Sequence, residues 1–438
     1  MRDLRLWWFC LALLPWSALG QRGSAEDALI SAQKAYSAGH YGEAESQYLI
    51  AVKEAESGGP TAPRLARVLN NLGVLYQREA KYDEAAQALR RALEIWQKQA
   101  DPQPLELATT LNNLASLYTY QSRFTEAEPL YRQCLALREK SLGPEHAQVA
   151  SALNNLGEFY WEQGRLDEAE PLYRRAVLIK EKALGPADPG LAASLNNLAT
   201  LCMRQGRYTE SESLYKRSLA VRQAAFGPEH PEVANSVNNL ASLYSVEGRY
   251  AEAEPMYLRS LSMAEKYLGP DHPDVACNLN NLAQLYFWQK KYAQAEPLLR
   301  RALAIREKAL GVSSPAVAEI LDNLAGVLLL EYKQVNVDVL YLRALAIRRK
   351  VFGPESPQVL SSLSALALAY AREGKSPEAE QTYFEALTLI ARQKKPDARA
   401  LATMYVNLAD LYSRQGKRKK ARKMAEKAKS LRDQGASS

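Results

Sequence analysis

Cysteine and histidine are scarce in this sequence, and their placement excludes two common kinds of site. There are four residues of each type among 438. Three cysteines lie beyond the N-terminal apolar run, and their odd number and wide gaps do not make a disulfide framework. His146, His230 and His272 recur at one position of a repeat. Stacked repeats would hold them about 10 Å apart, whereas zinc ligands must lie about 2 Å from one ion. We therefore predict no metal site and no cofactor.

Patterns typical of catalysis are also missing. The chain has no Ser/His/Asp order and no glycine-rich loop that would cradle a phosphate. Its paired carboxylates all belong to positions that recur with the repeat, at the starts of helices. We therefore expect a protein that is not an enzyme.

Long apolar runs are rare too, and the one clear example lies at the N-terminus. Two arginines precede the run LWWFCLALLPW, and small residues follow it. This arrangement is typical of a secretory signal, predicted here as residues 1–20 with cleavage between Gly20 and Gln21. The run is too short to span a bilayer comfortably. We expect an exported protein, periplasmic or extracellular, with an uncleaved membrane anchor as the alternative.

The rest of the chain is an array of repeats. The segment LNNLA or a near copy recurs, with asparagine pairs that begin at residues 70, 112, 154, 196, 238 and 280. Every step is 42 residues, and the same phase continues through positions 322, 364 and 406. A period of this length predicts a solenoid, in which each repeat buries its apolar face against its neighbours.

Each repeat is predicted to form two helices. In one of them, residues 108–121 carry apolar side chains at helical spacing, and residues 125–142 form a second amphipathic stretch after a short turn. Thr125 is the expected N-cap of the second helix, and Gly143 is expected to end it. Small residues recur at fixed positions among the large ones. We expect them to let the two helices approach closely.

These positions resemble those of a known family. A leucine followed by Gly or Ala, then Tyr, a Gly-Arg-Tyr turn, and then Ala, Tyr and Ala resemble the tetratricopeptide repeat. The longer unit, with EAEPLYRRAL and LGPEHPEVA, is similar to the 42-residue repeats of kinesin light chains. The resemblance covers residues 25 to about 433. It implies an all-α fold, a right-handed α-solenoid (superhelix) of about ten helical hairpins, and it specifies fold more than function.

The domain limits follow from the phase of the repeat. A first, shorter hairpin with a linker is expected at residues 21–62, and eight in-phase repeats at 63–398. A last repeat with a basic capping helix follows at 399–433, and a disordered tail is expected at 434–438.

The paired asparagines are the candidate binding residues. Asparagine is a mediocre helix former, so its recurrence inside helices needs another cause. We expect the first helices to line a concave groove, where rows of amides offer donors and acceptors to an extended peptide. In tetratricopeptide proteins the matching asparagines contact ligand peptides. The resemblance implies this role for Asn112, Asn113, Asn154, Asn155, Asn196, Asn197, Asn238, Asn239, Asn280 and Asn281. The alternative is that one row is structural and satisfies a neighbouring helix.

Other side chains are expected on the same face. Helical spacing from the asparagines leads to Trp161, Arg204, Phe287 and Trp288, of which the last two are the candidate for an apolar pocket. Exposed aromatic side chains in a groove are good anchors for a partner. Packing between adjacent first helices is the alternative. The predicted function is therefore a scaffold that binds a partner protein or an extended peptide in this groove.

The positive charge is concentrated in the last helix. The formal net charge of the chain is +7, and residues 417–432 carry nine Lys or Arg and one Glu, a net +8. A terminal repeat needs a polar outer face, which makes a solubilising cap the default interpretation. The alternative function is an adaptor that binds anionic lipid or another polyanion through Lys417, Arg418, Lys419, Lys420, Arg422 and Lys423. Nucleic acid is not expected, because no aromatic residues are interleaved with the charges.

Overall fold

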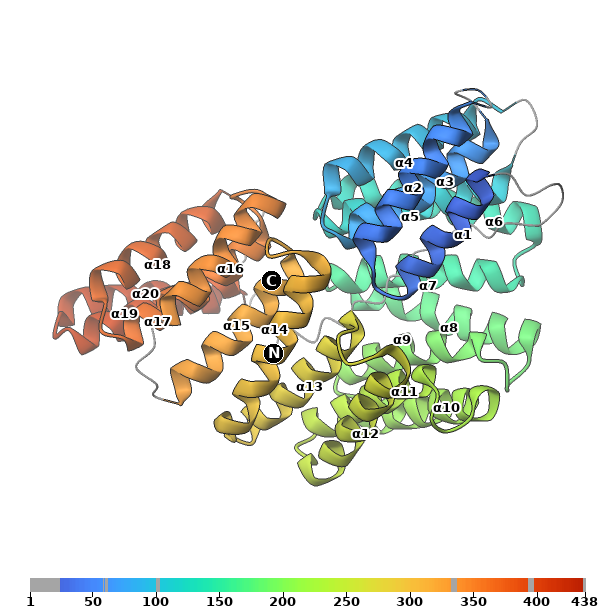
Figure 1. Ribbon diagram of the computed structural model, residues 1–438. Coiled ribbons are helices and arrows are strands. Elements are labelled where there is room, and N and C mark those ends of the chain that lie inside the picture. The colour runs from blue at the N-terminus through green and yellow to red at the C-terminus, as the bar shows by residue number, and fades with distance from the viewer. Residues whose placement is uncertain are drawn as a thin grey trace. The chain divides into compact units, whose positions relative to one another are not determined.

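The computed structural model describes residues 24–57, 59, 62–99, 103–331, 337–392 and 398–435. The predicted signal and its cleavage point at Gly20 and Gln21 lie outside these residues. Every regular element that the described part contains is an α-helix, and the helices follow one another as antiparallel hairpins (Figure 1). The prediction of an all-α fold is confirmed.

The odd-numbered helices open the hairpins, and the even-numbered helices close them. The opening helices are α1 (Ser24–Ser37), α3 (Pro63–Arg78), α5 (Pro104–Tyr120), α7 (Ala147–Glu162), α9 (Gly190–Arg204), α11 (Pro231–Val246), α13 (Pro273–Trp288), α15 (Pro315–Leu330), α17 (Pro357–Arg372) and α19 (Ala398–Arg414). The closing helices are α2 (Tyr41–Glu56), α4 (Tyr82–Gln97), α6 (Phe124–Leu142), α8 (Leu166–Leu184), α10 (Tyr208–Phe226), α12 (Tyr250–Leu268), α14 (Tyr292–Leu310), α16 (Val337–Phe352), α18 (Ser376–Ala391) and α20 (Arg418–Gly435).

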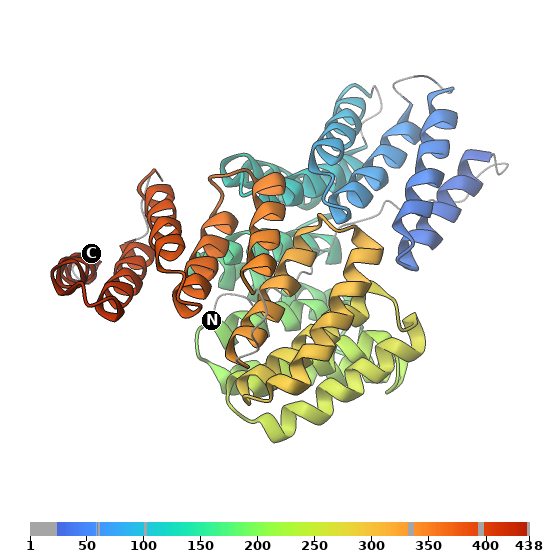
Figure 2. The same ribbon diagram turned by 60° about the vertical axis from the view of Figure 1, so that its left-hand side comes forward.

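Contacts between helices divide the chain into two compact units. The first unit comprises the described residues up to Leu285 together with Lys308–Leu310, and the second comprises Tyr286–Glu307 and the described residues from Gly311. In the first unit each helix from α1 to α12 packs against the next, and the opening helices α3 to α11 also contact one another. In the second unit α15 to α20 pack in the same manner (Figure 2). Each unit is thus a stack of hairpins, as a solenoid requires.

Small residues set the close approach of the two helices in a hairpin. A Cβ atom added to Gly157 on α7 would lie 2.7 Å from Cε1 of Tyr173 on α8, and one added to Gly73 would lie 2.6 Å from Cγ of Leu89. The small positions of the closing helices are almost fully buried. They hold Ala85, Ala127, Ala169, Ser211, Ala253 and Ala295, and then Ala92, Cys134, Ala176, Ser218, Ser260 and Ala302. The expectation that small residues bring the helices together is confirmed.

The ends of the helices show both a confirmed prediction and a wrong one. Gly143 ends α6 with φ +85°, a conformation that glycine adopts without strain, and its N–H donates to the carbonyl of Glu139 at 2.9 Å. Thr125 is not the N-cap of α6. The helix begins at Phe124, and Arg123 precedes it without a capping side chain. The helix therefore starts directly at the aromatic residue of the turn, which leaves Thr125 in the first turn.

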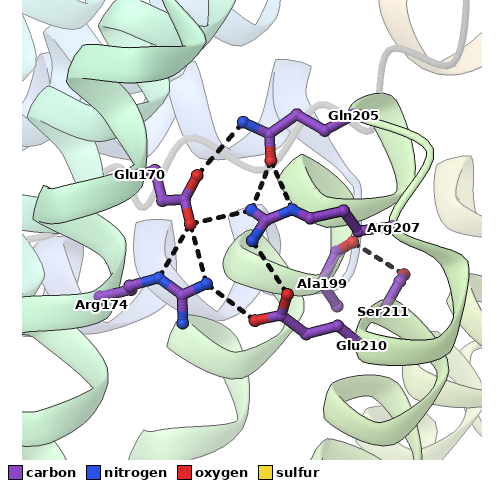
Figure 3. A network of polar contacts seen from close by, with 7 residues as sticks. All are labelled: Glu170, Arg174, Ala199, Gln205, Arg207, Glu210 and Ser211. Atoms are coloured by element: carbon purple, nitrogen blue, oxygen red, sulfur yellow. Dashed lines mark hydrogen bonds and ion pairs between the residues drawn. The ribbon is translucent and has the colours of Figure 1, made fainter.

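Ion pairs join the closing helices of adjacent repeats (Figure 3). Arg207, in the turn before α10, lies 2.9 Å from Glu170 of α8 and 2.9 Å from Glu210 of α10. Arg174 bridges the same two carboxylates at 2.8 Å each. The same ion pair between the arginine of the turn and a glutamate of the preceding repeat occurs one repeat earlier and one repeat later. Arg165 lies 3.3 Å from Glu128, and Arg249 lies 3.1 Å from Glu212. The arginine of the turn thus joins three of the hairpins to the hairpin before them, through Arg165, Arg207 and Arg249.

Candidate functional site

The asparagine pairs lie on the opening helices, where many of them bond to each other across repeats. In these contacts Nδ2 of the second asparagine of one repeat donates to Oδ1 of the first asparagine of the repeat before it. The contacts are Asn113 to Asn70 at 3.0 Å, Asn155 to Asn112 at 2.6 Å and Asn281 to Asn238 at 3.3 Å. We call each such pair a rung. At these three rungs the amides satisfy each other within the protein, which is the structural role weighed from the sequence.

Two rungs between them are not formed. Asn197 does not bond to Asn154, and Asn239 does not bond to Asn196. Asn154 instead donates through Nδ2 to Oγ of Ser194 at 2.6 Å. The Oδ1 atoms of Asn154 and Asn196 are buried and have no hydrogen-bond partner among the described residues. A buried acceptor left without a donor costs about 1–3 kcal/mol, so these two oxygens need an explanation.

A cavity of about 90 Å³ opens at these two rungs, between the opening helices α7, α9 and α11 and the closing helices α8 and α10. It is lined by Ser151, Asn154, Glu158, Trp161, Tyr173, Lys180, Ala193, Asn196, Asn197, Thr200, Arg222, Asn235 and Asn239. One buried water needs only about 10–15 Å³ of such space. The cavity therefore has room for a larger group beside the two unsatisfied oxygens.

Trp161 forms one wall of the cavity. Its indole Nε1 is buried and has no acceptor among the described residues. The guanidinium of the exposed Arg204 lies over the ring, 5.2 Å from its centroid. The structure thus brings together two of the residues selected from the sequence, and it leaves a buried donor beside the two buried acceptors.

The other two aromatic residues selected from the sequence, Phe287 and Trp288, do not line this cavity. Phe287 and Trp288 belong to the second unit and are half-buried. The ring of Phe287 packs edge-on against Tyr292 of the following helix, with centroids 5.7 Å apart. The apolar pocket at Trp288 stays a prediction.

Glu158 is a cavity residue that the sequence reasoning missed. It lies on α7, one turn after Asn154, and it is 8% exposed. It makes no hydrogen bond or ion pair with a described residue, and burial, followed by the nearby charge of Glu162, raises the pKa of its carboxyl group well above the ordinary value. The neighbouring repeats hold uncharged residues at this position, namely Val74, Ser116, Thr200, Ser242 and Gln284. That departure from the repeat was the signal available in the sequence.

Two cations line the same cavity, and both have partners within the protein. Lys180 of α8 donates through Nζ to the carbonyl of Gly190 at 2.7 Å. Arg222 of α10 donates to Oγ of Ser236 at 2.8 Å, and its Nε lies 3.4 Å from the carboxylate of Glu232. These contacts hold both cations against the opening helix of the next repeat, so their charge is partly matched before any ligand arrives.

The cations of the last helix have a different setting. The predicted contact residues on α20 and in the turn before it are all exposed: Lys417, Arg418, Lys419, Lys420, Arg422 and Lys423. Lys420 lies 3.6 Å from Glu380 and 5.0 Å from the ring centroid of Tyr412. Arg422 pairs with Glu426 of its own helix at 2.8 Å. Most of this positive surface faces solvent.

The described residues contain neither a metal-binding cluster nor a membrane-spanning helix. No group of three His, Cys, Asp or Glu side chains lies close enough there to hold a metal ion. None of the helices in that part is both long and apolar enough to cross a membrane. The three cysteines there are unpaired: Cys134 and Cys202 are buried, and Cys277 is exposed.

Comparisons with known proteins identify the repeat. Models described as tetratricopeptide repeats match residues 19–98, 106–182, 148–202, 190–266, 234–287, 274–333 and 339–390, and further models of that description match 317–358 and 402–434. A search of the curated proteins found no match.

Solved structures with similar folds were also found. The repeats of a putative kinesin light chain from Podosopora anserina are 27% identical, with a TM-score of 0.40, over 48% of this chain and 98% of that one. A Rap protein complexed with Competence and Sporulation Factor is 13% identical, with a TM-score of 0.52, over 85% and 99%. Aspartyl phosphate phosphatase F from Bacillus subtilis is 14% identical, with a TM-score of 0.50, over 83% and 92%. The repeat models cover most of the sequence, and the chain belongs to the tetratricopeptide repeat family.

Proposed function

We propose that this scaffold binds an extended segment of a partner protein across the opening helices α7, α9 and α11. Tetratricopeptide repeats indicate a protein-interaction scaffold. The observation that carries the narrower proposal is the pair of unformed rungs, where Oδ1 of Asn154 and Oδ1 of Asn196 are buried without a donor beside a cavity. The asparagines of the formed rungs then hold the stack together, and only the open rungs bind the guest.

A peptide backbone has the chemistry that these orphaned groups require. Each peptide unit offers one N–H donor and one C=O acceptor. The N–H groups match Oδ1 of Asn154 and Asn196, and a carbonyl matches Nε1 of Trp161. Residues three apart in a polyproline-II-like segment lie about 9 Å apart on one side, close to the separation of about 8–10 Å between packed helices. An extended segment therefore reaches both open rungs.

The test is a peptide array probed with the full chain. The probes are nonapeptides of mixed composition, and the variant is Asn154→Ala combined with Asn196→Ala. We expect the variant to bind these peptides at least tenfold more weakly, with a loss of stability limited to that of the hydrogen bond between Asn154 and Ser194.

The control for this test is Asn113→Ala, at a formed rung, which should destabilise the fold and leave peptide affinity unchanged. Equal affinity of the double variant and the original chain would overturn the proposal.

A second proposal concerns α20, where six cations are exposed along one helix and its preceding turn. We propose that this surface contacts anionic lipid or another polyanion as an alternative function. Such binding releases counterions, so its strength should fall steeply with salt, whereas binding at the open rungs should not. Sedimentation with vesicles rich in phosphatidylserine, at low and high salt, measures this. Binding that does not depend on salt would contradict it.

Export remains a proposal as well. The apolar N-terminal run and the small residues before Gln21 support removal of residues 1–20. Sequencing the N-terminus of the mature protein tests this directly. A mature chain that begins at Met1 would instead support the uncleaved membrane anchor.

A further inference from the structure

We propose that the cavity at the open rungs takes a cationic side chain, lysine or arginine, of the bound segment, with Glu158 as its counter-ion. This inference rests on the proposed function, since it names the kind of segment that the same site selects. The occupant is identified by charge and shape alone.

The carboxyl group of Glu158 is buried without a partner among the described residues. Glutamate is almost never fully buried unless it is paired, because an unpaired buried charge is costly. Glu158 is 8% exposed and has no hydrogen bond or ion pair with a described residue. The other repeats of the first unit place an uncharged side chain at this position. The acid is therefore particular to the repeat that forms the cavity.

The groups around Glu158 include two further oxygen atoms that lack hydrogen-bond donors. Oδ1 of Asn154 and Oδ1 of Asn196 line the cavity with Glu158, and both lack donors. An amide oxygen has two lone pairs, so each Oδ1 can accept from the peptide backbone and also from an ammonium or guanidinium group, which carries several N–H donors and no acceptor.

Neither of the two cations that line the cavity forms an ion pair with Glu158. Lys180 is bonded to a backbone carbonyl, and Arg222 is bonded to Ser236 and Glu232. The charged neighbour that acts on the Glu158 carboxyl group is another acid, Glu162. Burial and the nearby Glu162 favour the protonated form of Glu158 in the free protein, and a basic guest would supply the partner that favours its carboxylate.

The aromatic wall is compatible with such a guest. Arg204 places its guanidinium over the Trp161 ring at 5.2 Å, which shows that the quadrupole of this ring is accessible to a cation from at least one side. The aliphatic stem of a lysine or arginine can pack along the same wall while its charged head reaches the oxygens.

The experiment is a positional peptide set probed with the full chain. Nonapeptides of one mixed background carry Lys, Arg, Ala or Glu at the central position. We expect Lys and Arg to bind at least tenfold more tightly than Glu. Glu158→Gln keeps the size and shape of the side chain, and it should remove most of this preference while retaining binding of the Ala peptide. The matched control is Glu84→Gln on the surface of α4, where the residue is exposed, and it should keep the preference.

The outcomes separate the two proposals. If no peptide of the set binds, the proposed function fails and this inference fails with it. If peptides bind without preference for Lys or Arg, or prefer Glu, the inference is overturned while peptide binding stands. If Glu158→Gln retains the full preference, another group selects the cation and Glu158 is not its counter-ion. Melting curves of both variants ensure that they are folded.

Discussion

At the scale of the residue, the informative side chains are those whose hydrogen bonds the protein leaves unsatisfied. The first asparagine of each pair has different roles in different repeats. At Asn112 its Oδ1 accepts from the next repeat at 2.6 Å, whereas at Asn154 and Asn196 the same atom has no donor among the described residues. The sequence shows identical residues, and only the packing distinguishes the role of each one.

This difference predicts unequal costs for removing the amides. Asn113→Ala leaves Oδ1 of Asn70 without the Asn113 donor, which should lower the free energy of unfolding by about 1–3 kcal/mol. Asn196→Ala removes an oxygen that has no bond to lose, so its cost should be below about 1 kcal/mol. Denaturant unfolding of both variants measures the two costs. Equal losses would contradict the distinction between formed and open rungs.

Glu158 predicts a dependence of stability on pH. Burial, then Glu162, raises the pKa of its carboxyl group in the folded state above the ordinary value of 4.5. Below that ordinary value both states hold the proton, and the stability is complete. As pH rises toward the folded-state pKa, the unfolded chain releases the proton first, and stability falls by about 1.4 kcal/mol per pKa unit of difference.

Glu158→Gln lacks this titration. We therefore expect it to be more stable than the original chain at neutral pH and equal to it near pH 4. Denaturant unfolding over this range provides the comparison. A difference that grows toward low pH would mean that the carboxylate is stabilised in the folded state, opposite to the direction argued here.

At the scale of the element, the hairpin depends on close packing more than on surface charge. The ion pairs of Figure 3 join side chains that are 22–44% exposed, such as Glu170 and Arg174. Exposed pairs contribute about 0.2–1 kcal/mol each. A poor fit between the two helices costs more, because overpacking a protein interior lowers the free energy of unfolding by about 1–3 kcal/mol.

A substitution at Gly157 tests whether close packing contributes more to stability than the surface ion pairs do. Gly157→Val places branched atoms where a single Cβ already lies 2.7 Å from Tyr173. We expect a loss of about 1–3 kcal/mol in the free energy of unfolding. The control is Gly42→Val on α2, where an added Cβ meets nothing within 4 Å. Similar losses in both variants would indicate an effect of helix propensity rather than of packing.

Much of the element structure was predictable from the sequence, and its limits have physical causes. The 42-residue phase predicted the hairpins because identical apolar and small positions pack identically. Thr125 was misplaced because local capping preference is weaker than the geometry of the turn. The open rungs at Asn154 and Asn196 were not predictable, because the same asparagine pair is present at formed and open rungs and only the packed structure shows which bonds are made.

At the scale of the whole molecule, stability should be local to each stack. Repeats of a solenoid contact only their neighbours, so damage in one region stays near it. Leu366 on α17 is 2% exposed and belongs to the second unit. Leu366→Ala should cost about 2–5 kcal/mol there, while peptide affinity at the first unit changes less than twofold. Hydrogen exchange should speed up in α15–α20. Equal acceleration in α7–α11 would contradict local stability.

The most direct test of the account is a crystal structure of the full chain with the tightest-binding array peptide. Backbone N–H groups of the peptide should lie about 2.7–3.2 Å from Oδ1 of Asn154 and from Oδ1 of Asn196. A peptide bound to another surface, with both oxygens still lacking a donor, would contradict the claim that the open rungs are the binding site.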